Sequence, residues 1–260
     1  MTRFRAALIT GAGSGLGRAL AERLAEPGVT LVLTGRDAAR LEHCAAACRA
    51  GGATVEALVL DVADAAAMQA ALTEADCRLR FDLVIANAGI ARGREDAAFA
   101  RQTVQTNVLG VLNTVAPLID EMAARGSGQV GIVSSLSAFR ALGGPPGYAA
   151  SKAWARLYGE ALRGRYASRG VGVSVICPGF IDTPMVAEET RARAGPRLVS
   201  APVAAGIILR GLDRNAARIS FPRAAALEVW WLASAPVWWT DRHIRKRWRM
   251  ARVGGRGKPG

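Results

Sequence analysis

The stretch Thr10-Gly11-Ala12-Gly13-Ser14-Gly15-Leu16-Gly17 indicates the fold of this 260-residue chain. It follows an apolar run at 6–10 and precedes a helical pattern at 16–26. A strand, a glycine-rich turn and a helix N-terminus together make a phosphate site, because glycines let the backbone approach a pyrophosphate and the free N–H groups of the helix face it. The alternative is a tight strand-to-helix turn that binds nothing.

The spacing within this stretch narrows the kind of phosphate site. The GxGxxG pattern fails because its third position holds Leu16, and the Walker A pattern fails because no Gly-Lys-Ser/Thr follows. The pattern that fits is T-G-x3-G-x-G, through Thr10, Gly11, Gly15 and Gly17.

Short apolar runs and Ala/Leu-rich helical stretches alternate along the chain. We expect strands at 6–10, 30–34, 54–60, 83–86, 130–134 and 171–177, and helices at 16–26, 37–50, 64–75, 99–124 and 148–169. Continuous apolar strands separated by helices are typical of a parallel sheet buried on both faces, with right-handed connections. The sequence therefore predicts an α/β fold with a doubly wound Rossmann-type parallel sheet. We expect a single domain over 1–222 and a Trp/Arg-rich helical C-terminal appendage over 223–260.

The net charge is strongly positive and unevenly distributed. Lys and Arg number 34 against 21 Asp and Glu, a net of +13, and 51% hydrophobic residues exclude a disordered chain. Residues 221–260 hold 9 basic and 2 acidic groups, so 9 − 2 = +7 of the +13 lies in the last 40 residues. The total charge is compatible with nucleic acid, an anionic membrane or an anionic small molecule as partner.

The cysteines and the N-terminus point to a reducing compartment. None of the four cysteines forms a CxxC pair, and the two histidines make no ligand cluster, so we expect free thiols and no metal site. The N-terminus lacks a signal-peptide pattern, and no run of 18 uncharged apolar residues occurs. We expect a cytoplasmic protein.

Tyr148 and Lys152 lie four residues apart at the start of a predicted helix, so both side chains project from one face. An ammonium near a phenol lowers the pKa of the tyrosine toward neutrality, which makes Tyr148 a candidate general acid/base. Ser134 and Ser135 follow the strand at 130–134, at the carboxyl edge where α/β sheets bind ligands. The alternatives are an ordinary surface i,i+4 pair for Tyr148 and Lys152, and strand-end capping for the serines.

Taken together, these motifs resemble the short-chain dehydrogenase/reductase family, in the branch whose chains have about this length. The resemblance spans 6–222. It is carried by Thr10-Gly11-x3-Gly15-x-Gly17, Asp61, Asn87-Ala88-Gly89, Asn107, Ser135, Tyr148-x3-Lys152 and Pro178-Gly179-x3-Thr183, in that order.

The resemblance implies an NAD(P)-dependent enzyme that acts on CH–OH groups. It implies that Tyr148 exchanges the substrate proton and Ser135 binds the substrate oxygen. It also implies that Lys152 holds the nicotinamide ribose, with Asn107 supporting a water relay behind it. The implied cofactor contacts are Thr10, Gly11, Ser14, Gly15, Leu16, Gly17, Arg36, Asp61, Val62, Asn87, Ala88, Gly89, Tyr148, Lys152, Pro178, Gly179, Ile181 and Thr183.

Two further expectations follow from the same resemblance. A homodimer or homotetramer would form through the helices at 99–124 and 148–169. The alternative to an enzyme is a non-catalytic cofactor-binding regulator or scaffold on the same fold, which would be free to lose any of the four catalytic residues.

The residues at the end of the second predicted strand, Thr34-Gly35-Arg36-Asp37, indicate which cofactor is preferred. A carboxylate there would bind a ribose 2′-hydroxyl and repel a 2′-phosphate. The position holds Gly35, and the guanidinium of Arg36 suits a phosphate, so we expect NADP(H). Arg18 is a candidate second contact. The alternatives are Asp37 as the ribose ligand, which would restore NAD(H), and Arg36 as a solvated loop residue.

The substrate is expected to be an aliphatic, alicyclic or lipid-like alcohol or ketone. This expectation rests on apolar residues around the predicted site, and the alternative for each of them is ordinary core packing. They are Leu136, Phe139 and Leu142 before the tyrosine, and Phe180, Ile181, Met185 and Val186 after the sixth strand.

Tryptophan and arginine are concentrated near the C-terminus. The tryptophans are Trp230, Trp231, Trp238, Trp239 and Trp248, and the cations are Arg242, Arg245, Lys246, Arg247, Arg249 and Arg252. Such a segment is typical of packing on the protein's own body or a partner subunit, or of peripheral contact with an anionic membrane. Nucleic acid is disfavoured because no recognition fold accompanies the charge. We expect the residues past Gly254 to be disordered.

Overall fold

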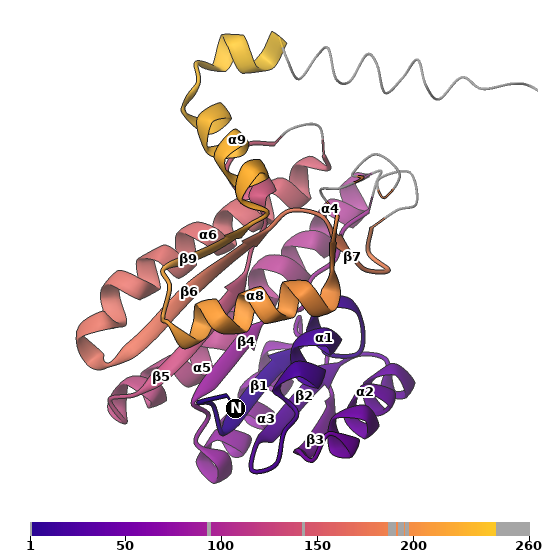
Figure 1. Ribbon diagram of the computed structural model, residues 1–260, viewed down its shortest axis with the longest axis vertical. Coiled ribbons are helices and arrows are strands. Elements are labelled where there is room, and N and C mark those ends of the chain that lie inside the picture. Colours follow the sequence, from indigo (N-terminus) through magenta and orange to yellow (C-terminus); the bar gives the residue numbers. More distant parts are fainter. Residues whose placement is uncertain are drawn as a thin grey trace, which may run out of the picture.

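A seven-stranded, all-parallel sheet forms the centre of the computed structural model, which describes residues 2–92, 95–141, 144–186, 191, 195 and 198–242 (Figure 1). The strand order is β3-β2-β1-β4-β5-β6-β9. The strands are β1 (Ala6–Thr10), β2 (Thr30–Gly35), β3 (Thr54–Val59), β4 (Leu83–Ala86), β5 (Gly128–Val133), β6 (Val171–Pro178) and β9 (Arg218–Phe221). The order reverses direction between β1 and β4, so the predicted doubly wound Rossmann-type sheet is confirmed.

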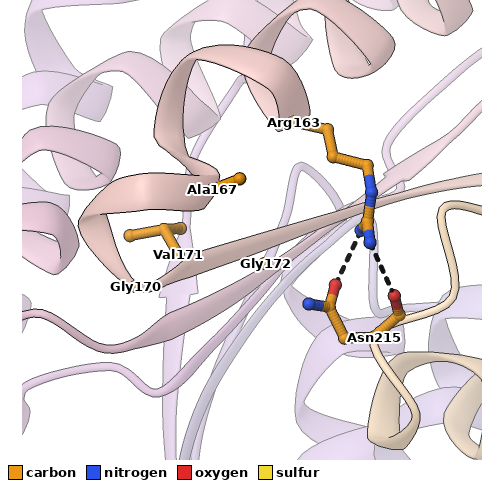
Figure 2. Close-up of a pocket in the computed structure, with 6 residues that line it drawn as sticks. All are labelled: Arg163, Ala167, Gly170, Val171, Gly172 and Asn215. Atoms are coloured by element: carbon orange, nitrogen blue, oxygen red, sulfur yellow. Dashed lines mark hydrogen bonds between the residues drawn. The ribbon is translucent and has the colours of Figure 1, made fainter.

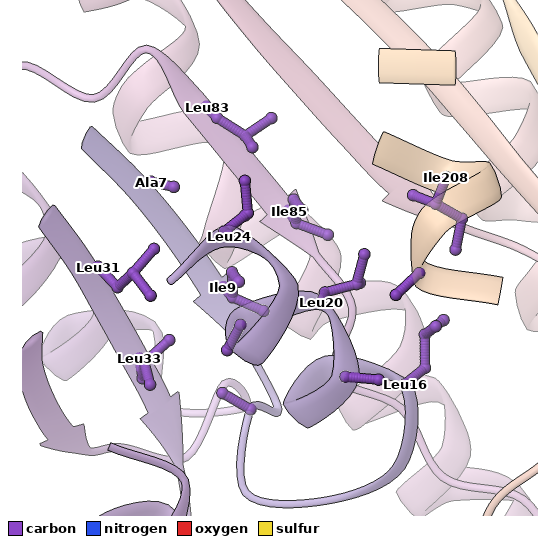
Figure 3. Packing of buried hydrophobic residues seen from close by; sticks show 14 of the residues in the cluster. Ala7, Ile9, Leu16, Leu20, Leu24, Leu31, Leu33, Leu83, Ile85 and Ile208 are labelled. Carbon is purple, nitrogen blue, oxygen red and sulfur yellow. The ribbon is translucent and has the colours of Figure 1, made fainter. Parts of the chain in front are cut away.

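Helices cover both faces of the sheet. On one face lie α1 (Gly15–Leu24), α2 (Ala38–Ala50) and α8 (Ala201–Asp213). On the other lie α3 (Ala65–Leu79), α5 (Gly110–Ala124) and α6 (Pro146–Tyr166). Successive strand residues point to opposite faces, so Ile9 packs beneath α1 and α8 (Figure 3). Leu8 packs beneath the other layer of helices.

The helix predicted over 99–124 is interrupted, and this part of the prediction is wrong. Helix α4 (Ala97–Val104) passes into one turn of π-helix, Gln105–Leu109, before α5 begins. The predicted helix at 148–169 is α6, which starts two residues earlier at Pro146 and ends in a 3₁₀ turn, Ala167–Arg169. Proline suits that start because its fixed φ fits the first helical turn.

Several elements after residue 178 were not predicted. These are α8, the short pair β7 (Ile181–Asp182) and β8 (Val199–Ser200), and the edge strand β9. Strand β9 reads Arg-Ile-Ser-Phe and pairs with β6 at the edge of the sheet. An edge strand with alternating polar residues carries no continuous apolar run for sequence reasoning to detect.

Helix α9 (Arg223–Ser234) follows β9 and rises away from the end of the sheet (Figure 1). Its buried residues Ala226 and Val229 pack in one cluster with Leu136 of the 3₁₀ turn Leu136–Ala138 and with Val175 of β6. Within the described ranges, no helix is long and apolar enough to cross a membrane. The predictions made for Trp248 and for residues past Gly254 lie outside the described residues.

Candidate active site

The glycine-rich stretch forms the turn between β1 and α1, at the carboxyl edge of the sheet. Ser14 precedes α1 in an extended conformation, is exposed, and makes no capping hydrogen bond with its side chain. The N–H groups of the first helical turn have no partner within the helix. A Cβ atom on Gly17 would lie 2.2 Å from the carbonyl oxygen of Gly11, so only glycine lets the turn close this tightly. We call this turn, with the backbone N–H donors at the start of α1, the glycine cradle.

Two side chains predicted to bind the cofactor instead tie the turn to the end of β4. Thr10 is fully buried, and its Oγ1 accepts hydrogen bonds from the backbone N–H of Asn87 at 3.1 Å and of Ala88 at 3.2 Å. The Asn87 amide donates to the carbonyl oxygens of Thr10 at 2.9 Å and Gly11 at 3.2 Å. Thr10 and Asn87 therefore position the two loops that flank the cradle.

Asn107 lies within the π-helical turn and is completely buried. Its side chain binds the backbone of Ile90 in both directions, accepting from the N–H at 2.8 Å and donating to the carbonyl at 3.0 Å. It also donates to Ser151 Oγ at 3.1 Å, and Ser151 donates to the carbonyl oxygen of Tyr148 at 2.8 Å. Asn107 thus joins the loop after β4 to the first turn of α6. Ser151 was missed at the sequence level, although its position three residues after Tyr148 on a helix was a usable signal.

Lys152 is 4% exposed and projects from α6 toward the end of β5. Its Nζ donates to the carbonyl oxygen of Val133 at 2.9 Å, while Ser134 Oγ donates to the backbone carbonyl of Lys152 at 2.7 Å. Burial lowers the pKa of the Lys152 ammonium from 10.5 to about 8. A Cβ atom on Gly89 would lie 3.3 Å from this Nζ, so the ammonium borders the loop that follows β4.

Tyr148 lies beside Lys152, with its ring centroid 5.9 Å from Nζ. Burial raises the pKa of Tyr148 above its ordinary 10.0, and a hydrogen bond with Ser135 opposes that shift. The expectation of a lowered Tyr148 pKa is therefore wrong for the protein alone. The physical reason is that loss of solvent around the phenol dominates, while the nearby ammonium points to the Val133 carbonyl.

Glu95 is a second residue that sequence reasoning missed. Its Oε2 accepts from the backbone N–H of Gly147 at 2.7 Å and so caps the N-terminus of α6, directly before Tyr148. The partner lies 52 residues away in sequence, and no local signal could have indicated the contact.

The end of β2 carries the residues predicted to choose the cofactor. Arg36 is half-exposed, and its Nη1 lies 3.8 Å from Asp61 Oδ2. Asp37 caps α2: its Oδ1 accepts from the N–H of Arg40 at 3.0 Å, and its Oδ2 lies 3.2 Å from Arg40 Nε. Arg18 forms an ion pair with Glu22 at 2.6 Å. Arg40, which sequence reasoning did not single out, stands with its Cβ 3.3 Å from the position of a Cβ on Gly13.

Several other predicted cofactor contacts have buried side chains. Leu16, Val62 and Ile181 pack in the hydrophobic interior, and Pro178 ends the buried strand β6. Because their side chains are buried, a ligand could contact only the backbone atoms of Leu16, Val62 and Ile181. Gly179 donates its N–H to the Phe221 carbonyl at 2.7 Å, and Thr183 packs against Gly15, where a Cβ would lie 3.2 Å from Thr183 Cβ.

The apolar residues expected around a substrate divide into two groups. Ile181 and Leu136 are buried in the interior, which corresponds to the core-packing alternative. Phe180 and Met185 are 48% and 49% exposed, and they are left as candidate pocket residues. Leu142 lies outside the described residues.

A cavity of about 180 Å³ lies elsewhere, at the start of β6 (Figure 2). It is lined by Arg163, Ala167, Gly170, Val171, Gly172 and Asn215. The Arg163 guanidinium already donates to Asn215 Oδ1 at 2.7 Å and to the Asn215 carbonyl at 3.0 Å. This cavity is separate from the carboxyl edge and contains none of the predicted catalytic residues.

Comparison with known proteins shows the family of the chain. The family model "short chain dehydrogenase" matches residues 5–194. The chain belongs to the short-chain dehydrogenase family. An uncharacterized oxidoreductase of Myxococcus xanthus strain DK1622 is 37% identical over 225 residues, which cover 84% of this chain and 88% of the relative. The predicted family and enzyme class are confirmed: the chain is an NAD(P)-dependent oxidoreductase that acts on CH–OH groups.

Solved structures of the family match the whole sheet. The crystal structure of levodione reductase superposes with a TM-score of 0.79 at 30% identity, covering 86% of this chain and 98% of the other. A short-chain dehydrogenase from Sphingobium yanoikuyae in complex with NADPH superposes with a TM-score of 0.75 at 25% identity, covering 98% of both chains.

Proposed function

We propose that this oxidoreductase interconverts an apolar alcohol and its ketone with NADP(H), using Tyr148 as general acid/base. The observation that carries the proposal is the convergence of Tyr148, Ser135, Lys152 and Asn107 beside the glycine cradle at one edge of the sheet. Open parallel sheets bind their ligands at that edge.

The residues present fit a dinucleotide. The free N–H groups at the start of α1 and the exposed Ser14 would hold the pyrophosphate. Gly89 leaves the approach to Lys152 Nζ open, so the ammonium would hold the nicotinamide ribose. The nicotinamide supplies or accepts the hydride.

The proton chemistry belongs to the chain's own side chains. Burial keeps the Tyr148 phenol protonated at neutral pH, so it can donate to a substrate carbonyl oxygen. Ser135, which hydrogen-bonds the phenol, would bind the same oxygen. The Lys152 ammonium would stabilise the phenolate that remains, and in oxidation the phenolate takes the proton back.

Asn107 would act one step behind this proton transfer. It holds Ser151, and through it the Tyr148 carbonyl, at the start of α6. A buried amide at this place would also support a water relay toward Lys152, as the family resemblance implies.

The preference for NADP(H) is supported by the end of β2. Asp37, the carboxylate that would favour NAD(H), is engaged in capping α2. Gly35 leaves the strand end without a side chain, and the guanidinium groups of Arg36 and Arg40 are 54% and 68% exposed beside it. Two cations next to the turn suit the additional phosphate of NADP(H).

Arg36→Ala should raise the Michaelis constant for NADPH about tenfold or more, because a charge-assisted phosphate contact contributes about 1.5–3 kcal/mol. The constant for NADH should change less than about twofold. Arg49→Ala is the matched control, since Arg49 lies near the other end of α2, is 44% exposed and is paired with Glu42. A native enzyme that prefers NADH would refute the assignment.

An activity screen tests the proposed reaction. Purified enzyme is offered apolar and polar ketones and alcohols with both cofactors, and the absorbance of the reduced nicotinamide is followed. We expect turnover with apolar compounds, because Phe180 and Met185 expose apolar side chains next to the end of β6. Tight cofactor binding without turnover on any compound would favour the non-catalytic regulator instead.

We also propose a homo-oligomer. Val104 and Leu109, around the π-helical turn, and Leu157 of α6 are 47%, 42% and 57% exposed. Exposed apolar side chains on these helices support the subunit contacts that the family resemblance implies. Light scattering of the purified protein measures its mass, and a monomer at all concentrations would contradict this proposal.

A further inference from the structure

Helix α9 and the residues that follow it to 242 have two different sides. Ala226, Val229 and Leu232 are buried on the inner side. The outer side exposes Leu227 (63%), Trp231 (62%), Val237 (61%) and Trp238 (72%), which we call the Trp face. Isolated exposed apolar residues are ordinary, but four large ones within twelve residues form a surface that favours leaving water.

The Trp face is held in place by packing. Trp231 contacts Trp239 edge to face, with ring centroids 5.2 Å apart. Trp230 packs edge-on against Phe139 at 6.1 Å, and Arg140 hydrogen-bonds Thr240 and lies 3.7 Å from Asp241. The exposed tryptophans therefore lie on a segment whose contacts with Phe139 and Arg140 hold it against the body of the enzyme.

The chemistry of the adjoining sequence narrows what can cover this face. Residues 243–260 contain seven Lys and Arg and no Asp or Glu. Because seven cations follow this face directly in the sequence, pairing it with a second copy would bring like charges into one complex, and their repulsion opposes that pairing. An anionic lipid surface attracts those cations, and each Lys or Arg near it strengthens binding about fivefold.

Tryptophan is also the side chain suited to a lipid headgroup region, because its ring is apolar and its N–H is polar. We propose that the Trp face docks this enzyme on an anionic membrane, with Trp231 and Trp238 inserted at headgroup level and the positive charge of the sequence after Arg242 attracting the enzyme to the lipid. The chain would then lie on the membrane surface without crossing it.

Docking would place the active-site edge near the lipid. Helix α9 packs on the turn Leu136–Ala138, which directly follows Ser135. An apolar ketone dissolved in the bilayer would then be close to the site, a consequence that rests on the proposed function, whereas docking itself does not.

Vesicle co-sedimentation of the full chain tests the docking. We expect binding to equimolar phosphatidylcholine/phosphatidylglycerol vesicles at low salt, and binding at least about tenfold weaker to phosphatidylcholine alone or in high salt. The double variant Trp231→Ser, Trp238→Ser should bind at least about tenfold more weakly. The control Val59→Ser, Val203→Ser changes two residues that are each 57% exposed elsewhere and should bind like the native chain.

Three results would overturn the proposal. One is equal vesicle binding by the double Trp variant and the native chain. The second is native binding that does not depend on anionic lipid. The third is an oligomer that dissociates only in the double Trp variant, which would make the face a subunit contact. NADPH binding by every variant verifies the fold, and an enzyme inactive on all ketones would refute the proposed function while leaving vesicle binding intact.

Discussion

The candidate active site buries polar side chains, whereas the Trp face exposes apolar ones. At the edge, Asn107 and Lys152 are polar yet fully enclosed, and backbone carbonyls or N–H groups satisfy them. On the Trp face, Trp231 and Trp238 are apolar yet exposed. Each arrangement costs folding free energy relative to the usual one. Both proposed functions therefore lie where stability is given up, by burying a charge in one place and by leaving apolar surface uncovered in the other.

The largest effect is expected in the glycine cradle. Gly17→Ala should weaken NADPH binding at least about a hundredfold, because its Cβ would lie 2.2 Å from the Gly11 carbonyl oxygen and force the turn apart. Fluorescence titration measures the dissociation constant. Gly164→Ala on α6 is the control, since nothing lies within 4 Å of its Cβ position and alanine favours a helix. Equal NADPH affinity of the two variants would contradict a phosphate site that depends on the close approach of Gly17 to the Gly11 carbonyl.

The next largest effect is the difference in stability loss between substitutions on the two sides of α9. Leu232→Ala removes a buried side chain, so the free energy of unfolding should fall by about 2–4 kcal/mol. Leu227→Ala removes a side chain that is 63% exposed, and the same quantity should change by less than about 0.5 kcal/mol. Urea unfolding of both variants measures the difference. Similar losses would mean that Leu227 is covered in solution.

Substitution of Lys152 should raise the free energy of unfolding, whereas the substitutions in α9 lower it. The folded pKa of about 8 is below the 10.5 of a solvated lysine, so the unfolded chain holds the proton more tightly and the buried charge destabilises the fold below pH 8. Lys152→Met should therefore raise the free energy of unfolding at pH 7 by about 1–3 kcal/mol while turnover is lost. The gain should shrink above pH 8 and vanish near pH 10.5. A destabilised variant at pH 7 would show that the Val133 hydrogen bond outweighs desolvation.

Local patterns predicted the fold and indicated which residues make up the candidate site. The alternation of apolar strands with helices indicated the sheet, and the spacing of Tyr148 and Lys152 placed both on one helix face. The capping role of Asp37 was also readable, because an aspartate directly before a helix is a frequent N-cap. It was instead considered as a ribose ligand.

What the sequence could not predict depends on tertiary contacts. The π-helical turn at Asn107 places a side chain that binds the backbone of Ile90, seventeen residues away. The direction of the Tyr148 pKa shift depends on how much protein surrounds the phenol, which no spacing reveals. Strand β9 was missed because its pairing with β6, rather than its own composition, makes it a strand.

The central claim is that Tyr148 carries the substrate proton. Tyr148→Phe keeps the ring and removes only the hydroxyl, so NADPH should bind within about twofold of the native affinity while turnover falls by about 10²–10⁴. Tyr158→Phe is the matched control, because Tyr158 lies on the same helix and stacks on Trp154 at 4.7 Å, and its turnover should be unchanged. Parallel measurement of NADPH binding and ketone turnover in the three proteins decides the matter: binding without turnover in Tyr148→Phe alone is the predicted result, and undiminished turnover in that variant would contradict the account.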